Sequence, residues 1–121
     1  MTEDLHPSTH PPLPPTTEDD RFSWLRLLRS RRVGIATFYR LLAEQGTAQN
    51  ALAALPNVAR AAGVENYSIC PEAVVQAEMR NGAQAGARLV FHGTPDYPQS
   101  LTDLSDAPPL LWAIGDLSLM N

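Results

Sequence analysis

The sequence has 121 residues, a formal net charge of −4 and a single cysteine. This length suits one domain of ordinary size, or a smaller domain with flanking segments. One cysteine excludes an intrachain disulfide, and no signal sequence or apolar run of about 18 residues argues for secretion or membrane insertion. We therefore expect a soluble, cytoplasmic protein.

The first residues predict a disordered tail over residues 1–18. Five of the 11 prolines lie between Pro7 and Pro15, and residues 1–20 hold five of the 13 acidic residues and no basic one. Such a segment buries too little apolar surface to offset the entropy of ordering it. Residues 21–121 contain nine arginines and eight acids, a net charge of +1. The acidic charge of the whole chain therefore does not exclude nucleic acid as a partner.

Two helices are predicted after the tail, joined by a tight turn. The first spans about residues 21–30, with Asp19 and Asp20 as candidate N-caps. The second spans residues 35–45, where apolar residues repeat at helical spacing and Gly46 supplies a left-handed C-terminal cap.

Two shorter helices are predicted next. Thr47 can cap a helix that runs through Leu55, and Pro56 can open a fourth helix that ends at Gly63. Connections of two to four residues force consecutive helices to pack against one another as an antiparallel cluster. Such a domain, over residues 19–63, has a small core and is expected to be marginal on its own.

The predicted core of this cluster consists of the apolar residues that repeat along its helices. Trp24 is expected to flank the apolar face of the first helix rather than to lie in the core. The core residues are Phe22, Leu25, Leu28, Val33, Ile35, Phe38, Leu42, Leu52, Leu55 and Val58.

The pattern changes after Gly63, which marks a predicted boundary to a second region over residues 64–121. A polar connection leads to a helix that begins at Pro71, has Glu72 in its first turn and continues to about residues 82–85. Residues 88–92 form a predicted strand bounded by glycines.

The last segment combines a short helix and a strand. Tyr97-Pro98 opens the helix and Pro108-Pro109 ends it. Residues 110–114 are an unbroken apolar run, typical of a strand buried inside a sheet. We expect this strand to pair with residues 89–91 at one side of a larger sheet, while Asp116 begins a further turn. Few partner strands are visible, so we expect a piece of a larger protein.

That incomplete sheet predicts which apolar side chains lack cover. Without further strands, residues of the last strand are prone to solvent exposure or to pairing between chains. They are Leu110, Leu111, Trp112 and Ile114.

Arginines gather around the first predicted turn. Residues 21–40 contain six arginines and no acid, and residues 30–42 have the layout of a helix-hairpin-helix module. Such a hairpin binds DNA phosphates through backbone N–H groups at the start of its second helix, helped by flanking arginines. The predicted phosphate contacts are Arg29, Arg31, Arg32 and Gly34. The alternative is a packing corner with solvated arginines, since Ala36 stands where the stronger motif has a second glycine.

No catalytic, cofactor or metal site is predicted. Cys70 precedes a proline at a helix N-terminus, which can lower the pKa of a thiol, but a buried or capping cysteine is the favoured alternative. No motif connects His92 with it, and His6 and His10 lie in the predicted tail without metal-ligand spacing. We expect no enzymatic activity and no cofactor.

Two blocks of the sequence resemble the N-terminal part of the DNA-processing protein A (DprA/Smf) family. The first, residues 24–56, has the family's Arg-Ser pair, its Val-Gly hairpin and its Thr-Phe helix before an alanine-rich helix. The second, residues 86–120, resembles the lead-in to the family's central domain. Its matching residues are Tyr97, Pro98, Leu101, Asp106, Pro108, Pro109, Leu111, Gly115 and Asp116.

The resemblance implies a mainly α fold in which a small SAM-like, helix-hairpin-helix domain precedes the first helix and strands of a truncated Rossmann-like α/β domain. It also implies binding of single-stranded DNA, chiefly through the downstream domain, and loading of the RecA recombinase in DNA uptake, natural transformation and recombination. A homodimer is a further implied partnership. The alternative from a different class is a protein-protein interaction module without direct DNA contact.

Overall fold

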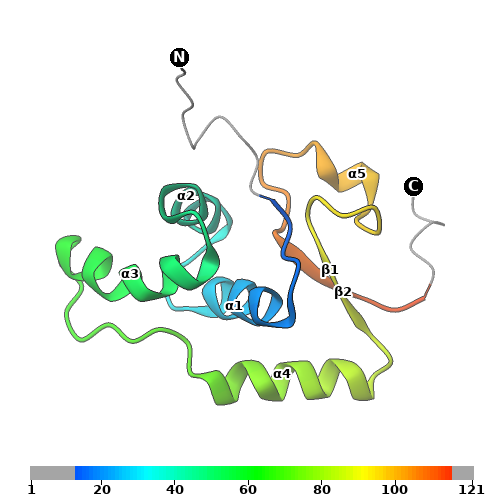
Figure 1. The fold of residues 1–121 in the computed structure, drawn as a ribbon, viewed down its shortest axis with the longest axis horizontal. Coiled ribbons are helices and arrows are strands. Elements are labelled where there is room, and N and C mark those ends of the chain that lie inside the picture. The colour runs from blue at the N-terminus through cyan, green and yellow to red at the C-terminus, as the bar shows by residue number, and fades with distance from the viewer. Residues whose placement is uncertain (1–12, 116–121) are drawn as a thin grey trace.

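The computed structural model describes residues 13–115 of the chain. Helices α1 to α3 cluster together, and α4 runs along the other side of α1 (Figure 1). Strands β1 and β2 form an antiparallel pair beside the helices. The described residues are thus mainly helical with one small sheet, as predicted. The elements are α1 Glu18–Arg29, α2 Ile35–Gln45, α3 Ala48–Ala61, α4 Glu72–Gln84, β1 Arg88–Phe91, α5 Gln99–Thr102 and β2 Leu110–Ala113.

Threonines cap two of the helices. The Thr17 hydroxyl accepts a 3.0 Å hydrogen bond from the Asp20 amide at the start of α1, and Thr47 caps α3 in the same way. The prediction of aspartate caps for α1 is therefore wrong. Both aspartates lie in the first helical turn, where their negative charge favours the helix dipole. Gly46 ends α2 with φ of +88°, as predicted.

The two helices predicted on either side of Pro56 are one helix, α3. Proline removes one backbone hydrogen bond and normally breaks a helix. Here Leu52, Leu55 and Ala59 are all buried, so the buried positions keep their helical spacing on both sides of Pro56. The proline itself is exposed. Tertiary packing therefore overrides the local preference for a break.

Trp24 lies at the centre of the core, and the prediction that it flanks the core is wrong. Its side chain is only 3% exposed, and its ring centroid lies 5.2 Å from that of Phe38 and 5.7 Å from that of Phe91. The buried face of α1 also includes Leu27, whereas Phe22 is only partly buried. The helix is thus rotated relative to the predicted face, because it packs against α4 as well as against α2 and α3.

The predicted strand pairing is confirmed. β1 and β2 are antiparallel, with Arg88 opposite Ala113 and Phe91 opposite Leu110. The described residues contain this two-stranded sheet, while the larger sheet stays a prediction. Leu110 was expected to lack cover but is buried, because it lies opposite Phe91 in the sheet and packs in the same cluster as Trp24. Ile114, by contrast, is 70% exposed.

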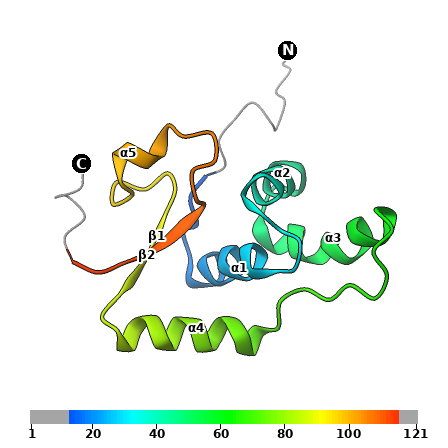
Figure 2. The same ribbon diagram turned by 180° about the vertical axis from the view of Figure 1, so that it is seen from behind.

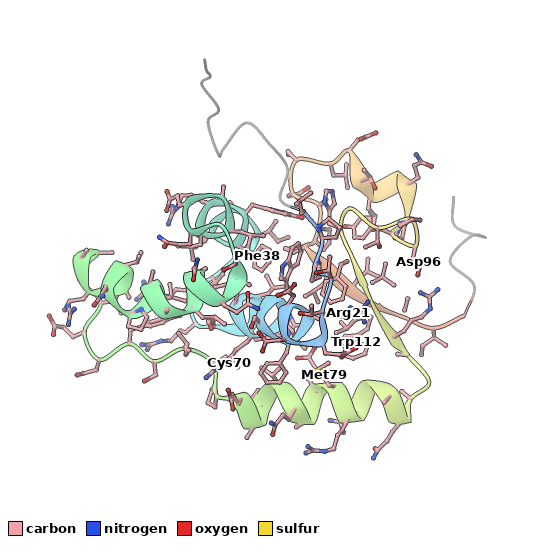
Figure 3. The ribbon with its side chains drawn as sticks, in the orientation of Figure 1. Arg21, Phe38, Cys70, Met79, Asp96 and Trp112 are labelled. Atoms are coloured by element: carbon pink, nitrogen blue, oxygen red, sulfur yellow. The ribbon has the colours of Figure 1, made fainter. Side chains whose placement is uncertain are left out.

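The core extends on both sides of the predicted boundary at residue 63. Cys70, Val75, Phe91 and Leu110 belong to the same cluster of buried side chains as Trp24. Helix α1 lies in the middle of it, with Phe38 on one side and Met79 on the other (Figure 3). The division into domains at residues 19–63 and 64–121 stays a prediction.

The predicted tail ends in a segment that packs on the fold. Pro15 is buried, and the Thr16 hydroxyl lies 3.3 Å from an Asp20 carboxylate oxygen. Residues 1–12 of the predicted tail, and the turn expected from Asp116, lie outside the described residues.

Candidate functional site

A tight hairpin joins α1 to α2, where the arginine-rich segment predicted a phosphate contact (Figure 2). The Ser30 amide donates to the Leu27 carbonyl at 3.2 Å, and the Val33 amide donates to the Ser30 carbonyl at 3.1 Å. Between them Arg32 has φ of +69°, a left-handed conformation that few non-glycine residues adopt. The chain therefore reverses direction within four residues.

The N-terminus of α2 is open toward solvent. Gly34 precedes the helix with no side-chain cap, and the first turn contains no acidic residue. A Cβ atom at Gly34 would meet nothing within 4 Å. The first backbone N–H groups of a helix have no intrahelical partner, so those of α2 are available to an anion.

Arg31 and Arg32 lie beside this helix terminus and are exposed. The Arg31 guanidinium stands over the ring of Tyr67, 5.2 Å from its centroid, and the Tyr67 hydroxyl donates to the Arg31 carbonyl at 2.5 Å. No hydrogen bond or ion pair engages the Arg32 side chain within residues 13–115. The structure therefore keeps Arg31, Arg32 and Gly34 together.

Arg29, the fourth predicted contact, turns toward α4 instead. Its Nε and Nη2 atoms each donate to a carboxylate oxygen of Glu78 at 2.9 Å. The indole N–H of Trp112 donates to the same carboxylate at 2.8 Å. Hydrogen bonds from Arg29 lower the pKa of Glu78, and the side-chain hydrogen bond from Trp112 adds to that effect.

Arg26 is a further charged residue whose role the sequence does not indicate. Its Nε donates to the Cys70 carbonyl at 2.6 Å, and its Nη1 lies 3.4 Å from Glu72. Arg26 and Arg29 together attach α1 to the start and middle of α4. These partners are more than forty residues away in sequence, so no local spacing predicts them.

The remaining polar candidates are held in structural contacts. Cys70 is buried, its amide donates to the Ser30 hydroxyl at 3.0 Å, and burial raises the pKa of its thiol. His92 lies between the rings of Tyr39 and Tyr97, with centroid distances of 5.9 and 5.1 Å.

Within residues 13–115, no three His, Cys, Asp or Glu side chains gather as metal ligands would. None of the helices in that range is long and apolar enough to cross a membrane.

Comparison with known families gives a match over the helical part of the chain. The family model of the DprA-like N-terminal HHH domain matches residues 18–81, which is more than half of the chain. The match includes α1, the hairpin, α2, α3 and most of α4. No curated protein matches the chain.

Proposed function

Because the chain belongs to the DprA family, we propose that it acts in a protein that binds single-stranded DNA and assists RecA loading during natural transformation and recombination. The role is non-enzymatic, requires no cofactor and belongs to the cytoplasm. The main DNA contacts lie in the Rossmann-like domain that the family resemblance implies. The helical domain contributes a secondary contact to the phosphate backbone.

The observation that carries this secondary contact is the open N-terminus of α2, which two exposed arginines precede in the hairpin. Backbone N–H groups at a helix start favour a phosphate, and the first turn of α2 has no acid to compete with it. Arg31 and Arg32 add two positive charges that no carboxylate of the described segment neutralises. Such a contact recognises the backbone and not the bases.

A protein-interaction module is the second candidate, and a specific observation favours it. Arg26 and Arg29 form ion pairs with Glu72 and Glu78 within the chain. Arg40 lies 3.9 Å from Glu44. Much of the arginine-rich segment is therefore neutralised internally. In this alternative the helices bind another protein or a second copy of the chain, and DNA contact lies elsewhere.

The two candidates are separated by the salt dependence of DNA binding. The test variant is Arg31→Ala with Arg32→Ala, and the matched control is Arg60→Ala with Arg80→Ala, which removes two exposed arginines from α3 and α4. Arg29 is left unchanged, since its removal would leave Glu78 without its ion pair. Binding of a fluorescent oligothymidylate is measured by anisotropy at increasing salt.

We expect weak binding by the unmodified chain at low salt and none at physiological salt, because few phosphates are contacted. The test variant should flatten the slope of log affinity against log salt by about 1.4, since each lost contact to single-stranded DNA accounts for about 0.7. The control should keep the slope. An equal slope in both variants would leave the interaction module as the better explanation.

A further inference from the structure

A groove lies between the α1–α2 hairpin and the connection that leads into α4. Its volume is about 500 Å³, and none of the described residues that line it is acidic. The lining residues come from the end of α1, the hairpin, the connection and the first turn of α4. They are Arg29, Arg31, Asn66, Ser68, Ile69, Cys70, Pro71 and Val74.

One side of the groove carries positive charge. Glu78 neutralises Arg29 through its two 2.9 Å hydrogen bonds, so Arg31 is the uncompensated charge. Tyr67 orients Arg31, because its ring lies under the guanidinium and its hydroxyl binds the backbone carbonyl. A cation held over an aromatic ring has less conformational freedom to lose when it binds an anion.

The other side of the groove is apolar and open. Val74 is 52% exposed in the first turns of α4, and Pro71 is exposed beside it while Ile69 is half-buried. About half of the valine is therefore left uncovered by the packing of α4. Surfaces that bind single strands combine positive charge for the backbone with aromatic side chains on which the bases stack. This groove has the positive charge, and the exposed aliphatic surface of Val74 and Pro71 offers a base an apolar contact in place of an aromatic ring.

We propose that the groove binds one or two nucleotides of single-stranded nucleic acid, with a phosphate on Arg31 and a base against Val74 and Pro71. The Asn66 and Ser68 side chains line the same groove and supply polar contacts to sugar or phosphate. This inference rests on the proposed DNA-binding function and extends the contact from the hairpin to the connection before α4.

The test adds a negative charge to the apolar side of the groove. Val74→Asp is compared with Leu104→Asp, which makes the same kind of change at an apolar residue that is 50% exposed next to α5. Binding of a short oligothymidylate to the 121-residue chain is followed at low salt by amide chemical shifts in NMR. Circular dichroism confirms that both variants remain folded, and inorganic phosphate serves as a second probe.

We expect the oligothymidylate to shift the amides of Asn66, Ser68 and Val74. Val74→Asp should weaken binding roughly tenfold, because a carboxylate near a phosphate repels it. Leu104→Asp should change the affinity less than about twofold, because α5 lies away from the connection that leads into α4 (Figure 1) and the repulsion between two charges falls with their distance.

Three outcomes would overturn the inference. Equal effects of the two variants, with the salt slope still dependent on Arg31 and Arg32, would show that the oligothymidylate contacts the hairpin but does not bind in the groove. Shifts of the same amides by inorganic phosphate at equal concentration would show an anion site only. Failure of the unmodified chain to bind the oligothymidylate at low salt would overturn both this inference and the secondary DNA contact.

Discussion

At the scale of single residues, Glu78 joins three elements of the fold. It accepts two hydrogen bonds from Arg29 of α1 and one from Trp112 of β2. A bidentate arginine-carboxylate pair is stronger and more directional than a simple ion pair. The contact fixes the position of α1 relative to α4 and also removes Arg29 from the set of free cations.

Replacing Glu78→Gln should lower the free energy of unfolding by about 1 kcal/mol at neutral pH, because the partly exposed ion pair is lost while the side chain keeps its shape. The matched control is Glu72→Gln, because the Glu72 side chain is 63% exposed and its carboxylate lies 3.4 Å from Arg26. Its effect should be smaller. Urea denaturation measures both values, and an equal loss in the two variants would contradict a special role of Glu78.

The same pair predicts a pH dependence. The pKa of Glu78 lies below its ordinary value of 4.5, chiefly because Arg29 donates to the carboxylate. Its stabilisation is therefore complete at neutral pH and is lost as acid protonates the carboxylate at pH values below 4.5. The stability difference between the unmodified chain and the Glu78→Gln variant should shrink over that range. A difference that stays constant down to pH 3 would contradict the assignment.

At the scale of elements, helix α4 holds β2 through a close approach at Gly82. A Cβ atom at this position would overlap the six-membered ring of Trp112. Glycine normally weakens a helix interior because of its conformational freedom. Here the missing side chain lets the indole lie directly on the helix backbone.

The substitution Gly82→Ala should therefore destabilise the protein, by about 1–3 kcal/mol from overpacking, although alanine is the better helix former. The control is Asn81→Ala in the same helix at an exposed position, which should stabilise slightly through helix propensity. Thermal unfolding followed by circular dichroism measures both. An increase in the melting temperature of the Gly82→Ala variant would show that Trp112 does not pack as described.

At the scale of the whole described segment, the larger of two buried clusters connects the helical cluster with β1 and β2. Trp24 contacts Phe38 of α2 and Phe91 of β1 through edge-to-face rings. Such aromatic pairs stabilise beyond their buried area. The helical cluster, which the sequence predicts to be marginal by itself, thus shares its core with the elements that follow it.

Changing Phe91→Leu should lower hydrogen-exchange protection in α1–α3 as well as in β1, with a loss of about 1 kcal/mol typical of a core substitution that roughly preserves volume. The reason is that Trp24 loses a ring partner on one side. Exchange measured by NMR reports each amide separately. Loss of protection confined to β1 and β2, with α1–α3 unchanged, would mean that the two parts unfold independently.

The sequence by itself determined the local elements and the family resemblance. The predicted bounds of α2 are the observed ones, and those of α4, β1 and β2 differ from the observed bounds by a few residues. They could be predicted because helical spacing, a C-terminal glycine and prolines are signals that act over a few residues. The hairpin residues Arg31, Arg32 and Gly34 remain together because they are neighbours in the chain. The family match over residues 18–81 agrees with the resemblance of the first block.

Only the tertiary structure decided the contacts between distant segments. In the structure α3 continues through Pro56 and α1 is rotated so that Trp24 lies at the centre of the core. Arg29 pairs with Glu78 instead of extending into solvent. The tertiary structure also brought Arg31 beside Tyr67 and formed the groove with Val74. Packing energy and long-range ion pairs depend on three-dimensional proximity, which no spacing in this single sequence records.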